Sequence, residues 1–164
     1  MELAGRFDDE RFRDPLVRLW EFLGEILVRC PRCGRRASVL PAPQTAGVSR
    51  RPWTRRSVSC LTCSYSAHVP GPKGNRGTIS LGGCSDAYFG LPLWLTTECR
   101  GHVLWAYNTE HLDLLEAFVS ARLRERGPIP GTMSMVERLP AWIKDAKHRD
   151  DVVSAIHRLR AMAA

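Results

Sequence analysis

Hydrophobic positions near the start of the chain recur at helical spacing. In residues 14–28, DPLVRLWEFLGEILV, apolar side chains repeat every three or four positions from Leu16 to Leu27. Asp14 is a suitable N-cap, and Pro15 would stand at the first helical position, where its missing N–H costs nothing. This pattern predicts an N-terminal helix that leads into the first cysteine pair.

The last third of the chain has the same periodicity. One helix is expected to begin at Asn108 or Thr109 and to run to Arg126, before Gly127, and another covers residues 150–162. Their inward-facing positions are Leu112, Leu115, Val119 and Leu123 in the first helix and Val152, Val153, Ile156 and Leu159 in the second. The sequence therefore predicts a helical C-terminal part.

A shorter helix is expected between these two. Ser134 followed three residues later by Glu137 is the signature of a capping box. The helix would run through Trp142, and Pro140 can restart or kink it.

The middle of the chain has strand character instead. Short runs rich in β-formers lie between Pro, Gly and Ser at residues 37–40, 56–60, 66–69 and 78–81. Residues 92–108, PLWLTTECRGHVLWAYN, predict a β-hairpin that turns at residues 98–101. Its alternating positions are Leu93, Leu95 and Thr97 on the first strand and Val103, Trp105 and Tyr107 on the second.

Positive charge is concentrated in this middle part. The chain carries +7 overall, but residues 26–85 hold ten Lys or Arg and no Asp or Glu, whereas the residues before them net −3 and those after them net zero. An even distribution of the acidic residues would place about six in that stretch. Such a segregated basic surface attracts polyanions, above all nucleic acid.

The sequence gives no sign of a membrane or secretory segment. The first 25 residues hold eleven charged side chains, and no apolar run approaches the roughly 18 residues that a membrane span needs. We therefore expect a soluble, cytoplasmic protein without a membrane partner. Because disulfides are reduced in the cytoplasm, its cysteines are expected to bind metal.

Four of the six cysteines form two C-x-x-C pairs, Cys30 with Cys33 and Cys60 with Cys63. Each pair presents two thiolates on one tight turn, and two such turns complete a tetrahedral site with Zn–S distances of about 2.3 Å. A redox dithiol would need a βαβ setting, which the residues around Cys30 do not offer. The spacing predicts one structural Zn²⁺. Iron is the alternative metal, because it takes the same number of ligands in an S4 site.

The sequence C-P-R-C-G, then a strand, an extended loop and S-V-S-C-L-T-C-S-Y, resembles the zinc ribbon of the TFIIB type. The later stretches AYFGLPLWLTTEC and LWAYNTEHLDLLEAFV are similar to functionally uncharacterised bacterial zinc-ribbon proteins. The resemblance covers roughly residues 28–70 and implies two knuckles on a three-stranded sheet held by zinc, but no particular activity. Because 26 residues separate the pairs, the loop at 41–53 is expected to project.

These patterns predict an α+β fold with three parts. Residues 1–28 form an N-terminal helical segment, residues 29–83 the zinc-ribbon module with a small antiparallel sheet, and residues 84–164 a β-hairpin and C-terminal helices packed as one body.

The loop between the cysteine pairs is the expected contact surface. Its stretch SRRPWTRR sets four arginines around one tryptophan, which combines cations for phosphates with an aromatic face for a base. The predicted nucleic-acid-binding residues are Arg35, Arg36, Arg50, Arg51, Trp53, Arg55 and Arg56. A solvated arginine-rich face with a packed tryptophan is the alternative, and the choice between DNA and RNA stays open.

A second metal site is a lesser hypothesis. Cys99 and His102 flank a turn at metal-ligand spacing, and Cys84 with His68 or His111 could complete the set. A lone cysteine near a hairpin is more often a small buried apolar residue.

Catalytic signatures are absent from the sequence. It contains no P-loop, no G-x-S-x-G and no H-E-x-x-H, so no catalytic residue and no small-molecule substrate are predicted. Three hypotheses follow: a non-enzymatic zinc-ribbon protein that binds nucleic acid in a regulatory or transcription-associated role, an adaptor with a structural zinc that binds a protein partner, and a metalloenzyme with a second metal.

Overall fold

The computed structural model describes residues 11–42, 54–69, 79–125 and 133–164. Contacts divide the chain into two compact units: unit 1 takes residues 1–18, 97–104 and 109–164, and unit 2 takes residues 19–96 and 105–108. Small sheets and helices occur in the described residues, so the fold class is α+β, as the pattern predicts. The boundaries differ from the three predicted parts, because segments distant in the sequence join in each unit.

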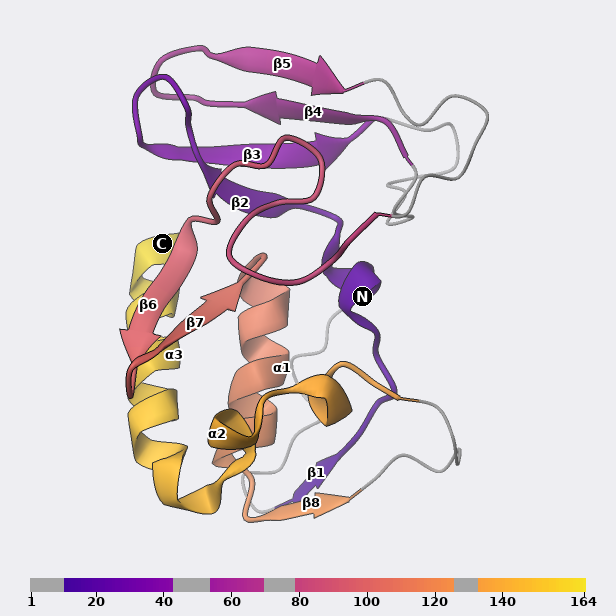
Figure 1. The fold of residues 1–164 in the computed structure, drawn as a ribbon, viewed down its shortest axis with the longest axis vertical. Coiled ribbons are helices and arrows are strands. Elements are labelled where there is room, and N and C mark those ends of the chain that lie inside the picture. The colour runs from indigo at the N-terminus through magenta and orange to yellow at the C-terminus, as the bar shows by residue number, and fades with distance from the viewer. Residues whose placement is uncertain (1–10, 43–53, 70–78, 126–132) are drawn as a thin grey trace. The chain divides into compact units, whose positions relative to one another are not determined.

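Unit 2 is built on a four-stranded antiparallel sheet in which sequence neighbours pair (Figure 1). Its strands are β2 (Ile26–Arg29), β3 (Arg36–Pro41), β4 (Arg56–Ser59) and β5 (Ser66–Val69). Val28, Val39 and Val58 are fully buried on it, and Val39 lies directly opposite Val58. The predicted strands at 37–40, 56–60 and 66–69 are confirmed, but residues 79–81 form none, and residue 78 lies outside the described residues.

The predicted N-terminal helix is wrong. Strand β1 (Arg11–Arg13), a short 3-10 helix η1 (Leu19–Phe22) and β2 occupy its region. Leu16 has a left-handed φ of 58°, and its N–H donates to Asp14 Oδ1 at 2.8 Å, so Asp14 caps a turn rather than a helix. The run from Ile26 to Val28 is buried at every position, and such a run cannot be told from a buried helix segment by spacing alone.

Unit 1 contains the two long helices, α1 (Thr109–Ser120) and α3 (Arg149–Ala163), which pack against each other. The short helix α2 (Ala141–Lys144) follows the 3-10 helix η2 (Val136–Arg138), and the 3-10 helix η3 (Ala146–His148) leads into α3. The predicted capping box is confirmed: the Ser134 N–H donates to Glu137 Oε2, and the Glu137 N–H donates to Ser134 Oγ. Helix α2 restarts after Pro140.

Helix α1 ends six residues earlier than predicted. The chain then forms β8 (Leu123–Glu125), which pairs in parallel with β1, and Leu123 is 55% exposed rather than inward-facing. The guanidinium groups of Arg124 and Arg149 donate to the Val119 carbonyl. These bonds give a carbonyl in the last turn of α1 hydrogen-bond donors from outside the helix, so the helix can end there without a further turn.

The predicted hairpin is confirmed as β6 (Leu95–Cys99) and β7 (His102–Ala106). Arg100 and Gly101 both have positive φ, as a two-residue type I′ turn requires. On β7 the buried side chains are Leu104 and Ala106, while Val103 is 52% exposed.

The helices of the described residues are too short or too polar for any of them to span a membrane.

Candidate metal centre

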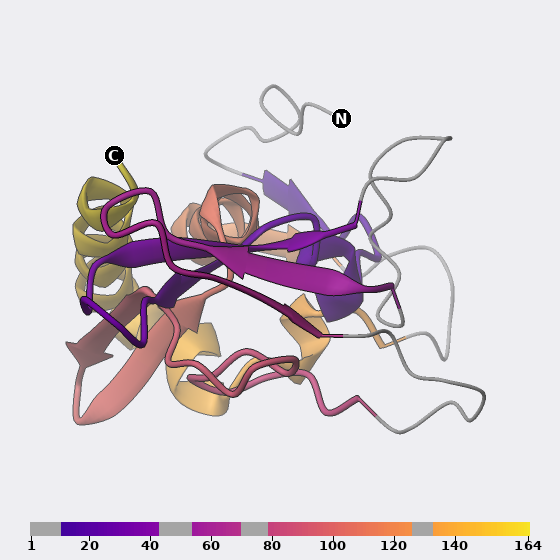
Figure 2. The same cartoon turned by 90° about the horizontal axis from the view of Figure 1, so that it is seen from above.

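The four cysteines of the C-x-x-C pairs lie in two hairpin turns of the unit 2 sheet. Residues 30–35, the first knuckle, connect β2 to β3, and residues 60–65, the second knuckle, connect β4 to β5. Both turns lie side by side at one end of the sheet, which is clear in both views (Figures 1 and 2). We call it the knuckle end; the connection from β3 to β4 leaves from the opposite end.

The two knuckles repeat one backbone design. The Cys30 N–H donates to the Arg35 carbonyl at 2.8 Å, and the Cys60 N–H donates to the Tyr65 carbonyl at 2.9 Å. Each turn has one residue in the left-handed region directly after its second cysteine, Gly34 with φ 71° and Ser64 with φ 56°. This conformation turns the chain back sharply, which brings both thiols of a pair to one side.

The four sulfurs have the spacing of a tetrahedral site. Their Sγ atoms all lie within 4.8 Å of one another, and the Cys30–Cys63 and Cys33–Cys60 pairs are each 3.6 Å apart. Four sulfurs at a Zn–S distance of about 2.3 Å would be about 3.8 Å apart at tetrahedral corners. The four cysteines can therefore hold one metal ion.

The pKa values of these thiols differ, and they show that the four cannot all ionise near neutral pH without a cation. Burial opposes ionisation of Cys60, but the N–H groups of Cys63 and Thr62 stabilise its thiolate and lower its pKa to about 6. Burial and the neighbouring thiols raise the pKa of Cys63 to about 12. Four thiolates at this spacing repel one another, so a bound divalent cation is what allows all of them to ionise.

The site is closed by protein ligands. Cys30 and Cys60 are 3% and 2% exposed, and Cys33 lies at the surface. Four thiolates complete a tetrahedral shell and leave no position for water or substrate, which is typical of a structural site.

The second predicted metal site does not form among the described residues. There, Cys30, Cys33, Cys60 and Cys63 are the only group of three or more His, Cys, Asp or Glu side chains whose ligand atoms lie close enough to share a metal ion. Cys84 is exposed, whereas Cys99 is buried with its Sγ 3.7 Å from the Asp151 carbonyl. The His102 ring stacks on Trp142 at 4.9 Å. Of the proposed fourth ligands, His68 is exposed on β5 and His111 is buried in α1.

The predicted nucleic-acid-binding residues fall at opposite ends of the sheet. Arg35 and Arg36 lie at the knuckle end, and Arg55 lies at the other end. Strand β3 separates these ends by about 17 Å, from five residue steps of 3.3–3.4 Å. Arg50, Arg51 and Trp53 lie outside the described residues.

Arg56 differs from the other arginines of the set because it is only 2% exposed. Its guanidinium donates to the Leu23 carbonyl and lies 4.8 Å from the centre of the Tyr88 ring. Burial lowers its pKa, and Tyr88 opposes that shift. Arg56 thus stabilises unit 2 and does not offer a surface contact.

Two arginines that were not predicted as site residues belong to the knuckle end. Arg29 ends β2 and lies 5.1 Å from the centre of the Trp94 ring, and Arg32 is inside the first knuckle. Both are exposed. Their positions next to Cys30 and Cys33 in the sequence were the signal that could have identified them.

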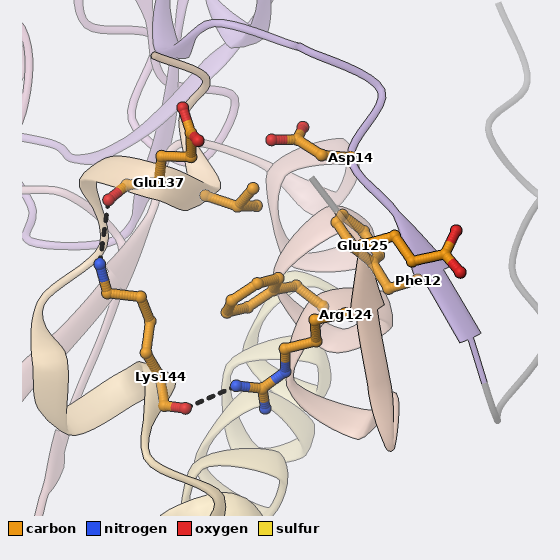
Figure 3. Close-up of a pocket in the computed structure, with 8 residues that line it drawn as sticks. Phe12, Asp14, Arg124, Glu125, Glu137 and Lys144 are labelled. Carbon is orange, nitrogen blue, oxygen red and sulfur yellow. Dashed lines mark hydrogen bonds between the residues drawn. The ribbon is translucent and has the colours of Figure 1, made fainter. Parts of the chain in front are cut away.

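A separate cavity of about 240 Å³ lies within unit 1 (Figure 3). Phe12, Phe118 and Val136 give it apolar walls, and the rest of its lining is Asp14, Arg124, Glu125, Glu137 and Lys144. Lys144 Nζ donates to the Glu137 carbonyl at 3.0 Å, and Arg124 donates to the Lys144 carbonyl at 2.5 Å. These bonds join β8, η2 and α2, so the polar groups hold unit 1 together.

Comparison with protein-family models, with curated proteins and with solved structures finds no match for this chain. The functional argument therefore rests on the geometry and charge of the molecule itself.

Proposed function

We propose that the four cysteines hold one zinc ion, and that the sheet they stabilise binds nucleic acid through its arginines. Zinc suits the site because it accepts four thiolates in tetrahedral geometry without redox chemistry. The two cysteine knuckles on an antiparallel sheet support the zinc-ribbon resemblance of residues 28–70, but this sheet has four strands where the resemblance implies three. In this proposal the metal is structural and the protein catalyses no reaction.

One observation carries the nucleic-acid proposal. Described residues 26–42 and 54–69 contain six arginines and no carboxylate, and five of these arginines are exposed: Arg29, Arg32, Arg35, Arg36 and Arg55. Because these segments contain no acidic side chain, their exposed side chains carry net positive charge, and four of the five arginines lie at the knuckle end. Phosphate contacts of this kind give affinity without sequence preference.

The test is the salt dependence of binding to labelled DNA and RNA, measured by fluorescence anisotropy with metal-loaded protein. Each phosphate contact on duplex DNA contributes about −0.9 to the slope of log K against log salt concentration. Replacing Arg29, Arg32 and Arg35 with alanine should flatten the slope, by up to about 2.7 if each contacts one phosphate. Arg122→Ala with Arg138→Ala removes two exposed arginines from unit 1 and is the control for charge lost elsewhere on the chain: it should keep the wild-type slope.

A second set of variants tests the loop between the cysteine pairs. Replacing Arg50, Arg51 and Arg55 with alanine shows whether the arginines of this loop add phosphate contacts of their own. If wild-type protein fails to bind at low salt, or if every arginine variant keeps the wild-type slope, the nucleic-acid proposal is refuted.

An adaptor role is the second candidate, because unit 1 exposes large apolar side chains. Val103, Leu123 and Met133 are each more than half exposed. A partner bound to them should remain bound in high salt, since apolar contacts are not screened. The third hypothesis, a metalloenzyme, predicts a second metal per chain at Cys84, Cys99 and His102, and the described structure offers no such cluster.

A further inference from the structure

Leu61 is almost completely exposed at the tip of the second knuckle. Its exposed fraction is 97%, compared with 40–55% for the other exposed large hydrophobic residues among those described. It follows Cys60 and lies two positions before Cys63, so the backbone on either side of it leads to a cysteine of the sulfur cluster. Its side chain therefore projects into solvent from a backbone that the cluster holds in place.

Arginines lie next to this projection. The first knuckle lies beside the second, since Cys30 Sγ and Cys63 Sγ are 3.6 Å apart, and it carries exposed Arg32 and Arg35. In the sheet behind it, Arg29 and Arg36 are directly opposite each other in the β2–β3 register. Together these arginines concentrate positive charge at the knuckle end, which suits an anionic ligand.

A ligand for this surface must combine an apolar interior with negative charge on its rim. Duplex DNA does so in the minor groove, where stacked bases lie between two rows of phosphates. Proteins that bind there often insert a leucine or a similar apolar side chain between base pairs, which partly unstacks and kinks the duplex. An acidic protein surface shares the charge, but it has no regular pair of phosphate rows to flank a single projecting side chain.

We propose that Leu61 is an apolar wedge that enters the minor groove of duplex DNA, with Arg32 and Arg35 on the flanking phosphates. This inference rests on the proposed nucleic-acid function and makes it more specific. It names duplex DNA as the ligand, the knuckle end as the contact surface and kinking of the DNA as the consequence.

The experiment compares wild-type protein with Leu61→Ala on a short duplex that carries 2-aminopurine and a donor–acceptor pair of dyes at its ends. The wedge predicts increased 2-aminopurine fluorescence and closer ends with the wild type, and loss of both with Leu61→Ala. The affinity of Leu61→Ala for the duplex should be about tenfold lower, because the variant loses the apolar contact of one leucine side chain. The salt slope should stay unchanged, because Leu61 carries no charge.

Leu40→Ala is the matched control, because Leu40 is 40% exposed on β3 near the opposite end of the sheet. It should bind and kink the duplex as the wild type does. Metal content and circular dichroism should be the same in both variants, since neither side chain is buried.

The outcomes separate the two proposals. If wild-type protein binds the duplex but Leu61→Ala binds and kinks it equally well, the wedge is refuted while nucleic-acid binding stands. If the wild type does not bind at low salt, both are refuted. If duplex binding is independent of Leu61 while a labelled peptide of glutamate and leucine binds only when Leu61 is present, the surface belongs to a protein partner and the wedge is wrong.

Discussion

A buried histidine, His111, should make the stability of unit 1 sensitive to acid. His111 is 2% exposed on α1, and burial lowers its pKa to about 3. In the unfolded chain its pKa returns to about 6.5, so below that value the unfolded state takes up a proton that the folded state does not. Its contribution to stability is therefore fully present above about pH 6.5 and is lost progressively as the pH falls toward about 3.

The size of the effect follows from these two pKa values. Between about pH 7.5 and about pH 5.5, the linkage relation gives a loss on the order of 1 kcal/mol in the free energy of unfolding. The full difference, reached only below the folded pKa, is on the order of 5 kcal/mol. The range from about pH 7.5 to about pH 5.5 is a better choice than values near the folded pKa, because the thiolates must keep their metal during the measurement.

Urea unfolding of wild-type protein and His111→Gln, followed by far-UV circular dichroism, measures the effect. This signal reports mainly unit 1, which contains both long helices. Glutamine does not titrate, so between the two pH values the variant should lose less stability than the wild type, by on the order of 1 kcal/mol. The exposed His68→Gln should behave as the wild type. If His111→Gln loses as much stability as the wild type, a neutral buried His111 is the wrong explanation.

Three further substitutions test separate features of the fold, each by the free energy of unfolding. Ser134→Ala removes the hydrogen bond to Asp14, which is 7% exposed, and should cost about 1–3 kcal/mol; a neutral result would mean that the bond adds nothing. Gly34→Ala meets no atom within 4 Å but must keep a φ of 71°, so backbone strain alone should cost about 1–2 kcal/mol; unchanged stability would contradict that conformation. Arg100→Ala removes an exposed ion pair with Asp151 and should cost less than about 1 kcal/mol; a larger loss would show a structural role.

The cysteine cluster could be predicted from the sequence because its signal is local. Each C-x-x-C turn fixes its own two sulfurs, and the strands on either side of each turn are short enough to form hairpins. Pairing of β3 with β4 then brings the two turns to the same end of one sheet. The capping box of Ser134 and Glu137 was predictable for the same reason, since both partners lie within one turn.

The errors arose where distant segments decide the structure. Residues 26–29 become a strand because β3 lies beside them, and α1 ends at Ser120 because Arg149, 29 positions later, helps to satisfy its last carbonyls. Arg56 has the same charge as Arg55, but only its position against Leu23 and Tyr88 buries it. Spacing along the chain contains none of these contacts.

The metal content of the protein tests the central claim most directly. We expect elemental analysis of protein purified without added metal to find one zinc per chain, with loss of the zinc in Cys60→Ser and retention in Cys84→Ser and Cys99→Ser. Wild-type protein without metal, or zinc that persists in Cys60→Ser and disappears in Cys99→Ser, would contradict a metal centre at the four cysteines.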